Sequence, residues 1–182
     1  FGHNDQPGKP GRSTDLATEF PDNLRRYVRE VRAAGGTAVL LTPLTRRQFK
    51  EGMLVDGLAP WAEATRKVAA ELDIPLVDLH ARSVAAVQGM GPVQAMRLAQ
   101  ARPLPEQVTA AQAGTTIGAT PAASAGATAA APQDNAAVEP MGAPKAAFDY
   151  THLGREGADF FAAIVADELA RQVPALRRNL IP

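Results

Sequence analysis

Two short apolar runs joined by a helical segment most constrain the fold of this chain. Residues 37–42 and 76–79 are almost entirely apolar and have the length of strands, which is typical of parallel strands covered on both faces. Between them, Trp61, Val68 and Leu72 recur at helical spacing. This strand–helix–strand order predicts an α/β fold with an open parallel sheet, in which sites form beyond the carboxyl ends of the strands.

Apolar residues recur at helical spacing in three further segments. The first is capped by Asp22 or the residue before it and stopped by Gly35 and Gly36, the second covers residues 81–100 with a break at 89–92, and the third ends before Pro174. Helices before, between and after the strands predict a three-layer α/β/α arrangement. The apolar faces of the first and third helices are formed by Leu24, Tyr27, Val28 and Val31 and by Ala158, Phe161, Ile164, Val165 and Leu169.

The composition excludes several classes of partner and chemistry. The chain has 182 residues, of which 46% are apolar, and no run long enough to span a bilayer, so we expect one globular domain outside the membrane. Its 19 basic and 19 acidic residues cancel, which leaves no long-range field to attract nucleic acid. The absence of cysteine excludes disulfides, thiolate catalysis and cysteine-ligated zinc.

Residues 103–147 differ in composition from the rest of the predicted domain, which covers residues 1–182. Ala, Thr, Gly and Pro dominate this stretch, and it contains no aromatic residue. Such a segment buries too little apolar surface to offset the entropy lost on ordering it. It is therefore predicted to be a flexible insertion or a loose lid, not a second domain.

The beginning of the chain resembles the end of a strand that enters a loop. Residues 1–5 read Phe-Gly-His-Asn-Asp, and residues 6–18 are rich in turn-forming and basic types. We therefore expect that an N-terminal part, which would carry the first strands of the sheet, precedes Phe1. Asn4, Thr42 and Asp78 all fall near predicted strand ends.

Asp149 and His152 are the strongest candidates for chemistry. They are three residues apart and directly precede the last predicted helix. In so tight a connection the carboxylate can reach one imidazole nitrogen and leave the other free to face a nucleophile, as acyl transfer requires. An isolated histidine at the start of a helix usually makes an ordinary hydrogen bond. The second polar cluster, around Asn4, favours a shared site instead.

The two polar segments together resemble the SGNH, or GDSL, hydrolase superfamily, and most of all its rhamnogalacturonan acetylesterase branch. Gly-x-Asn-Asp at residues 2–5, followed by Asp-x-x-His at 149–152, is typical of the superfamily. The Gly-His-Asn-Asp form and the Thr-His step favour the branch. The resemblance covers most of the chain apart from the insertion, and it implies a flavodoxin-like parallel sheet that here lacks its N-terminal strands.

The resemblance implies a role for three residues. Asn4 matches the asparagine whose amide donates into the oxyanion hole, His152 matches the general base, and Asp149 matches the carboxylate that orients this base. Each role agrees with the chemistry of its side chain. The remaining polar residues of interest are expected to be structural, with His3 and Asp5 bracing the loop around Asn4, and His80 following a strand.

The sequence departs from the family pattern at the serine nucleophile. In the superfamily, a Gly-Asp-Ser nucleophile block and an oxyanion glycine lie upstream of the asparagine, and neither is found in this sequence. The serines of the chain, Ser13, Ser83 and Ser124, stand in no such context. We therefore expect the chain by itself to be inactive, and to be poorly soluble or loosely folded because strands would be missing.

The implied function is a serine carbohydrate esterase that removes O-acetyl groups from a pectin-type polysaccharide such as rhamnogalacturonan. The resemblance implies an acetylated polysaccharide or oligosaccharide as partner, no metal or organic cofactor, and a secreted or periplasmic location. Two alternatives remain. Another SGNH lipase or thioesterase would need an apolar acyl groove, and a non-catalytic carbohydrate-binding relative would lack the nucleophile.

Overall fold

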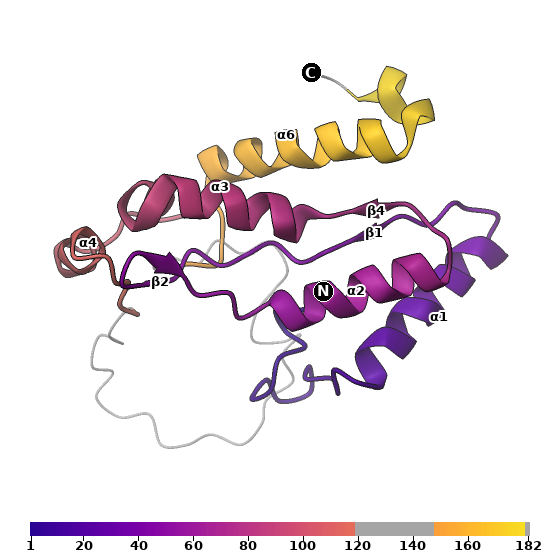
Figure 1. Cartoon of the computed structure of the whole chain (residues 1–182), viewed down its shortest axis with the longest axis horizontal. Helices are drawn as coiled ribbons and strands as arrows, with labels where there is room; N and C mark the ends of the chain where they lie inside the picture. The colour runs from indigo at the N-terminus through magenta and orange to yellow at the C-terminus, as the bar shows by residue number, and fades with distance from the viewer. Residues whose placement is uncertain (119–147, 181–182) are drawn as a thin grey trace.

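The computed structural model describes residues 1–118 and 148–180 and has a small parallel strand pair at its centre (Figure 1). Strand β1 (Leu40–Leu41) pairs with β4 (Leu76–Val77), with Leu40 opposite Leu76. Helix α2 (Ala59–Glu71) lies between the two strands in the sequence, close to its predicted place. The two apolar runs thus form the predicted parallel pair in a mixed α/β fold.

Both strands are shorter than predicted. The Leu40 N–H donates to the carbonyl of Pro75, and the Thr42 N–H donates to the carbonyl of Val77. Pro75 has no N–H to donate, so the next hydrogen bond of the ladder, toward residues 37–39, cannot form. At the other end, the Asp78 side chain accepts the N–H of Ala81 and starts the next helix, which ends β4 before the predicted boundary.

Helices cover both sides of the strand pair. Figure 1 shows α1 (Glu19–Ala33) and α2 on one side, and α3 (Leu79–Gln94) and α6 (Arg155–Gln172) on the other. Each side has its own apolar core, because alternate strand residues point to opposite faces. The first core consists of Phe20, Leu24, Trp61 and Val68 with Leu40 packed against it, and the second includes Phe49, Val77, Leu79, Val87, Leu98 and Phe161.

Helix α1 begins at Glu19, before both predicted capping positions, Pro21 and Asp22. The cause is Asp15, whose carboxylate accepts the N–H groups of Ala17 and Thr18 at 2.9 and 2.8 Å and closes the turn that leads into the helix. An Asx turn, and not a residue at the first helical position, sets this boundary.

The core face of α6 also differs from the prediction at one position. Ala158 is exposed, and Gly157 is buried in its place. Phe161 is buried as predicted, while Ile164, Val165 and Leu169 are half-buried against the same core. In α3 the predicted break is present, because Gly91 has a φ of 72°.

The segment after β1 contains a hairpin. Strands β2 (Phe49–Lys50) and β3 (Met53–Leu54) pair in antiparallel fashion around Glu51 and Gly52. Both turn residues have positive φ, at 52° and 78°, as a two-residue hairpin of the primed class requires. The Glu-Gly pair between short apolar groups is the sequence signal for this hairpin.

Part of the predicted flexible insertion is helical. Helix α4 (Pro105–Gln112) follows the short helix η1 (Ala95–Leu98), and its Ala111 packs with Met96 in a third apolar cluster. Composition alone does not indicate this helix, because composition does not register such packing. Residues 119–147, the rest of the predicted insertion, lie outside the described residues.

Residues 3–5 form a turn, and residues 1–2 are in no strand. Gly2 has a φ of 100°, and its N–H donates to the Asp5 carboxylate at 2.6 Å. No described strand lies beside these residues to form a ladder with them. At the other end, the short helix η2 (Pro174–Asn179) follows α6.

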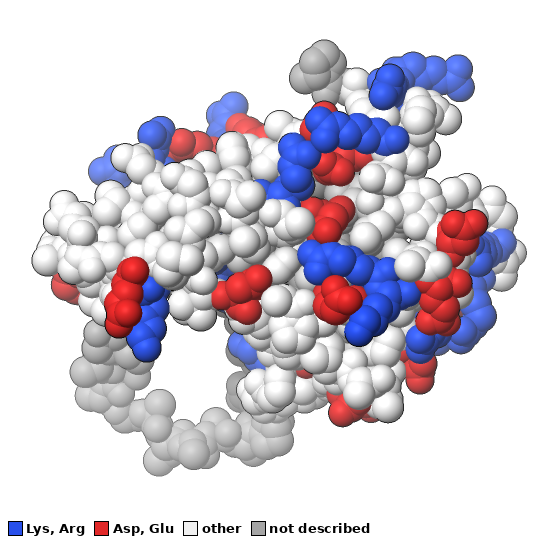
Figure 2. Space-filling model, viewed as in Figure 1, with Lys and Arg blue, Asp and Glu red and all other residues white. Residues whose placement is uncertain are grey.

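Charged side chains of both signs are interspersed on the face shown in Figure 2, mostly over the half that holds α1 and α2. Several form pairs across elements, such as Arg25 with Glu71 at 2.6 Å and Arg66 with Asp78 at 2.9 Å. Among the described helices, none combines the length and apolar character that crossing a bilayer requires.

Candidate active site

Asp149 and His152 form a hydrogen-bonded pair in the loop that leads into α6. The imidazole Nδ1 lies 2.7 Å from Asp149 Oδ2, and Asp149 Oδ1 accepts the N–H groups of Thr151 and His152, both at 2.7 Å. Partial burial opposes ionisation, but the hydrogen bonds from His152 and Thr151 outweigh it and lower the pKa of Asp149 below its ordinary value. An ionised Asp149 fixes the proton on Nδ1.

The other imidazole nitrogen, Nε2, has no hydrogen-bond partner among the described residues, and the His152 side chain is 46% exposed. A neutral imidazole with Nδ1 protonated presents the Nε2 lone pair to the solvent. The pair therefore has the geometry of a base held by an orienting acid.

Alternation between buried and outward side chains explains this local arrangement. Phe148 and Tyr150 are both 5% exposed and pack with Met96 and Ala111, and the Tyr150 hydroxyl donates to the carbonyl of Ile117 at 2.8 Å. Asp149 between them is half-buried, and His152 after them is exposed.

Asn4 lines the same pocket as this pair. The pocket has a volume of about 670 Å³, and residues from the two ends of the described chain meet in it. The sequence-predicted residues Asn4, Asp149 and His152 are thus brought together. The pocket is lined by His3, Asn4, Lys9, Arg12, Leu44, Arg46, Asp149, Thr151, His152 and Leu153.

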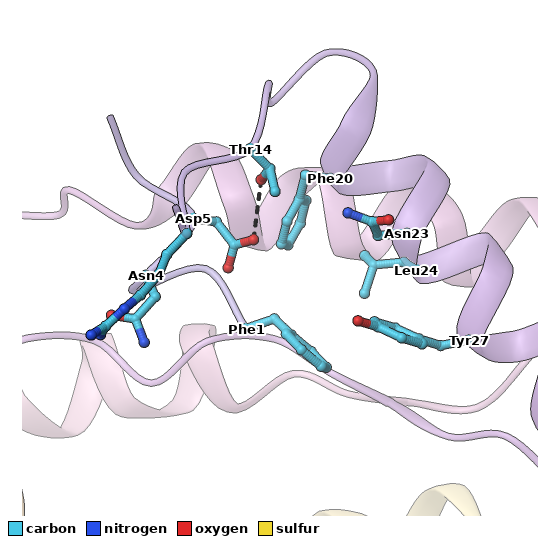
Figure 3. Close-up of a pocket in the computed structure, with 9 residues that line it drawn as sticks. Phe1, Asn4, Asp5, Thr14, Phe20, Asn23, Leu24 and Tyr27 are labelled. Atoms are coloured by element: carbon cyan, nitrogen blue, oxygen red, sulfur yellow. Dashed lines mark hydrogen bonds between the residues drawn. The ribbon is translucent and has the colours of Figure 1, made fainter. Parts of the chain in front are cut away.

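Asn4 and Arg12 also line a second, smaller pocket of about 340 Å³, shown in Figure 3. In this view Asn4 and Asp5 lie on one side, and Asn23, Leu24 and Tyr27 of α1 lie on the other. Asn4 therefore stands between the pocket of His152 and a pocket with aromatic walls.

Asp5 braces the loop around Asn4, and the half-buried His3 lies in the same loop. The Asp5 carboxylate accepts the Gly2 N–H and, at 3.1 Å, the Thr14 hydroxyl (Figure 3). Burial and the nearby charge of Arg46 lower the pKa of His3 to about 4, so its ring is neutral at neutral pH.

Thr42, Asp78 and His80 form a separate network at the end of the strand pair. The Thr42 hydroxyl donates to Asp78 at 2.9 Å and accepts the N–H of His80 at 2.8 Å. Asp78 also accepts from Arg66 at 2.9 and 3.0 Å, and His80 Nε2 lies 2.8 Å from Asp56. None of these residues lines the pocket of His152, and His80 is 4% exposed, in agreement with its predicted structural role.

The two described serines have other partners. The Ser13 hydroxyl donates to the carbonyl of Gln6 at 2.8 Å, and the buried Ser83 hydroxyl donates to the carbonyl of His80 at 3.1 Å. Neither serine lines the pocket of His152. Ser124 lies outside the described residues.

Basic residues form a large part of the pocket wall, and their role was not recognised from the sequence. Lys9, Arg12 and Arg46 contribute positive charge, and Asp149 is the acidic residue of the lining. Arg46 donates to the amide oxygen of Gln6 at 2.6 Å. Among residues 1–118 and 148–180, no group of three or more His, Asp or Glu side chains is arranged to hold a metal ion.

The chain is similar to rhamnogalacturonan acetylesterases over about half of its length. It is 35% identical over 99 residues to rhamnogalacturonan acetylesterase RhgT of Bacillus subtilis (strain 168), a match that covers 54% of this chain and 41% of the relative. It is 32% identical over 86 residues to the probable rhamnogalacturonan acetylesterase YesY of the same organism, which covers 47% and 40%, respectively.

The chain thus spans about two fifths of the length of these curated relatives. No family model matches the chain, and no solved structure matches it. The resemblance to the SGNH hydrolase family that the motifs indicate agrees with these partial matches.

Proposed function

We propose that this chain supplies the general base, its orienting acid and an oxyanion donor of an SGNH carbohydrate esterase that deacetylates a pectin-type polysaccharide. One observation carries the proposal, namely that the Asp149–His152 pair opens into a pocket that Asn4 also lines. The similarity to rhamnogalacturonan acetylesterases supports the reaction class.

In the proposed mechanism, His152 Nε2 takes the proton of a serine hydroxyl as its oxygen attacks the acetyl carbonyl carbon. Asp149 keeps Nδ1 protonated and stabilises the imidazolium that forms. The Asn4 amide donates to the oxyanion of the tetrahedral intermediate. Collapse of this intermediate transfers the proton from His152 to the leaving sugar oxygen, and water then releases acetate from the acyl-serine with the same base. The attacking hydroxyl is not assigned to a described residue.

The chemistry of the pocket supports an acidic sugar as substrate. Lys9, Arg12 and Arg46 line the same pocket as His152, where their positive charge would attract the carboxylate of a uronic acid residue. A lipase or thioesterase would need an apolar groove, whereas Leu44 and Leu153 are the aliphatic side chains of this lining. The polar wall therefore favours a polysaccharide over a long acyl chain.

The proposal is tested with the protein expressed from its complete coding sequence. We expect acetate release from acetylated rhamnogalacturonan, with slower release from acetylated xylan and little hydrolysis of long-chain nitrophenyl esters. His152→Ala should reduce kcat roughly a thousandfold or more, and Asn4→Ala roughly a hundredfold.

Two results would favour the alternatives. Preferential hydrolysis of long-chain esters would indicate a lipase or thioesterase. Binding of the acetylated oligosaccharide without hydrolysis of any ester, combined with a coding sequence that contains no Gly-Asp-Ser block, would indicate the non-catalytic relative.

A further inference from the structure

Arg47 is the most deeply buried charged side chain near the candidate site. It is 1% exposed, and no carboxylate forms an ion pair with it among the described residues. Burial lowers its pKa to about 10, against the opposing effect of the nearby Asp149 charge, so the guanidinium stays charged at neutral pH. A buried cation is costly unless hydrogen bonds compensate it.

The hydrogen bonds of Arg47 go to one short segment, the loop of residues 149–152. Its backbone N–H donates to the carbonyl of Tyr150 at 3.0 Å. Its guanidinium donates to the other three carbonyls of the loop, to Asp149 at 3.2 Å, to Thr151 at 3.4 Å and to His152 at 2.9 Å. One residue thus provides a donor to four consecutive carbonyl oxygens.

The backbone N–H groups of the same loop are bound by one of its own residues. Asp149 accepts the N–H groups of Thr151 and His152 as well as the imidazole proton. The loop has no helix or strand ladder that would pair its carbonyls, and buried carbonyls without partners are costly. Arg47 and Asp149 together therefore replace the regular hydrogen bonding that this segment lacks.

Arginine is the side chain suited to this arrangement. Its guanidinium presents five N–H donors in a rigid planar fork, while lysine has three donors on a single nitrogen and cannot span separated carbonyls in the same way. The guanidinium Nε has no partner among the described groups, so the fork is engaged through its two terminal nitrogens.

We propose that Arg47 is a positioning residue, which fixes the backbone of residues 149–152 so that His152 Nδ1 faces the Asp149 carboxylate. It acts through the loop and lies behind the site, since it does not line the pocket. The inference depends on the proposed function only in the catalytic meaning of the pair, because the geometry itself can be measured without any turnover.

The test is an NMR measurement of the histidine ring protons in the ¹⁵N-labelled protein, expressed from its complete coding sequence, and in its Arg47→Met and Arg47→Lys variants. In the wild type we expect a slowly exchanging Nδ1 proton for His152, held by Asp149. In Arg47→Met this signal should be lost, while the His80 ring signal, held by Asp56, should persist as an internal control of folding. Arg46→Met is the matched control, because it deletes the adjacent charge while the loop carbonyls keep their donors.

Arg47→Lys keeps the positive charge but loses the planar fork, so it distinguishes the effect of the charge from the effect of the hydrogen bonds to the loop carbonyls. Loss of the His152 signal in Arg47→Lys with the His80 signal retained supports the proposal, also where Arg47→Met fails to fold. Retention of the His152 signal in either variant overturns it, as does its loss in Arg46→Met. Loss of both histidine signals in both Arg47 variants would mean that Arg47 supports the whole fold and not the loop, which also overturns the proposal. Failure to release acetate would leave these signals unchanged and would count against the proposed function alone.

Discussion

His3 lies in the wall of the candidate site with a ring that burial keeps neutral. Its pKa is about 4 in the folded chain, against an ordinary value of 6.5. Between these values the unfolded chain binds more protons than the folded chain, so the free energy of unfolding falls as the pH falls through this window. Above pH 6.5 the ring is neutral in both states, so His3 no longer lowers the free energy of unfolding.

We therefore predict that His3→Gln flattens the pH dependence of thermal stability. The wild type should lose Tm more steeply than the variant between pH 6.5 and 4, and the two curves should run parallel above that window. Calorimetry in matched buffers measures the difference, which isolates His3 from the other histidines. Parallel curves over the whole range would contradict the lowered pKa.

A substitution at Arg46 tests the proposal that the substrate contains an acidic sugar. Arg46→Gln removes a pocket charge, so KM for acetylated rhamnogalacturonan should rise about three- to tenfold, and more than KM for neutral acetylated xylan. Arg29→Gln, an exposed change on α1 outside the pocket, is the matched control. Equal effects on the two polysaccharides would count against a carboxylate contact.

At this scale, the sequence predicts what short spacing determines. The contact between Asp149 and His152 follows from their separation by three residues, and the motif at residues 2–5 indicates that Asn4 shares their site. The burial of Arg47 could not be predicted in the same way, because its partners lie more than 100 residues further along the chain. In the structure Thr45, Arg47 and Phe49 are buried in alternation with half-buried or exposed residues, but the polar sequence of residues 45–48 does not show this pattern.

Among the elements, α6 meets η1 through two glycines. A Cβ at Gly157 would meet the carbonyl of Leu98, and a Cβ at Gly154 would lie 2.6 Å from the carbonyl of Ala99. Backbone atoms cannot move aside as a flexible side chain can, so these glycines allow the close approach.

Gly157→Ala should accordingly destabilise the protein by about 1–3 kcal/mol. Gly89→Ala is the matched control, because Gly89 lies within α3 with open space around it, and there alanine should stabilise by up to about 1 kcal/mol. Chemical denaturation measures both changes. If the two substitutions shift stability in the same direction, the close contact does not limit this position.

The elements that were predicted correctly are those with a sustained apolar period. The apolar pattern of the sequence predicts helices α2 and α6 and the parallel pairing of β1 with β4. The hairpin of β2 and β3 and helix α4 were missed because each is short and is stabilised by contacts with distant residues. Thr116, for example, accepts the N–H of Phe49 through its side chain at 2.8 Å.

For the whole molecule, the outer edge of β1 is the feature with the largest consequence for solution behaviour. β1 pairs with β4, and no other strand among the described residues pairs with it. Leu41 on this strand is 47% exposed, and Val31 of α1 is 39% exposed. An open edge with apolar side chains favours pairing between chains.

We predict that residues 1–182, expressed alone, self-associate, and that Leu41→Lys shifts the population toward the monomer. A charge on an edge strand opposes pairing with a second strand. Size-exclusion chromatography with light scattering measures the mass of both proteins. A monomeric wild type with a cooperative melt and a dispersed NMR spectrum would contradict the expectation of a poorly soluble chain.

The hydrogen bonds of Arg47 affect the stage of folding at which the candidate site forms. They join segments 102 to 105 residues apart, so forming them closes a long loop, and the entropy lost in that closure delays their formation. The base and its acid can then be aligned only late in folding, after the helices have docked. A partly folded population would contribute secondary structure but no competent imidazole, and recovery of the His152 ring signal on refolding should lag behind recovery of helical circular dichroism.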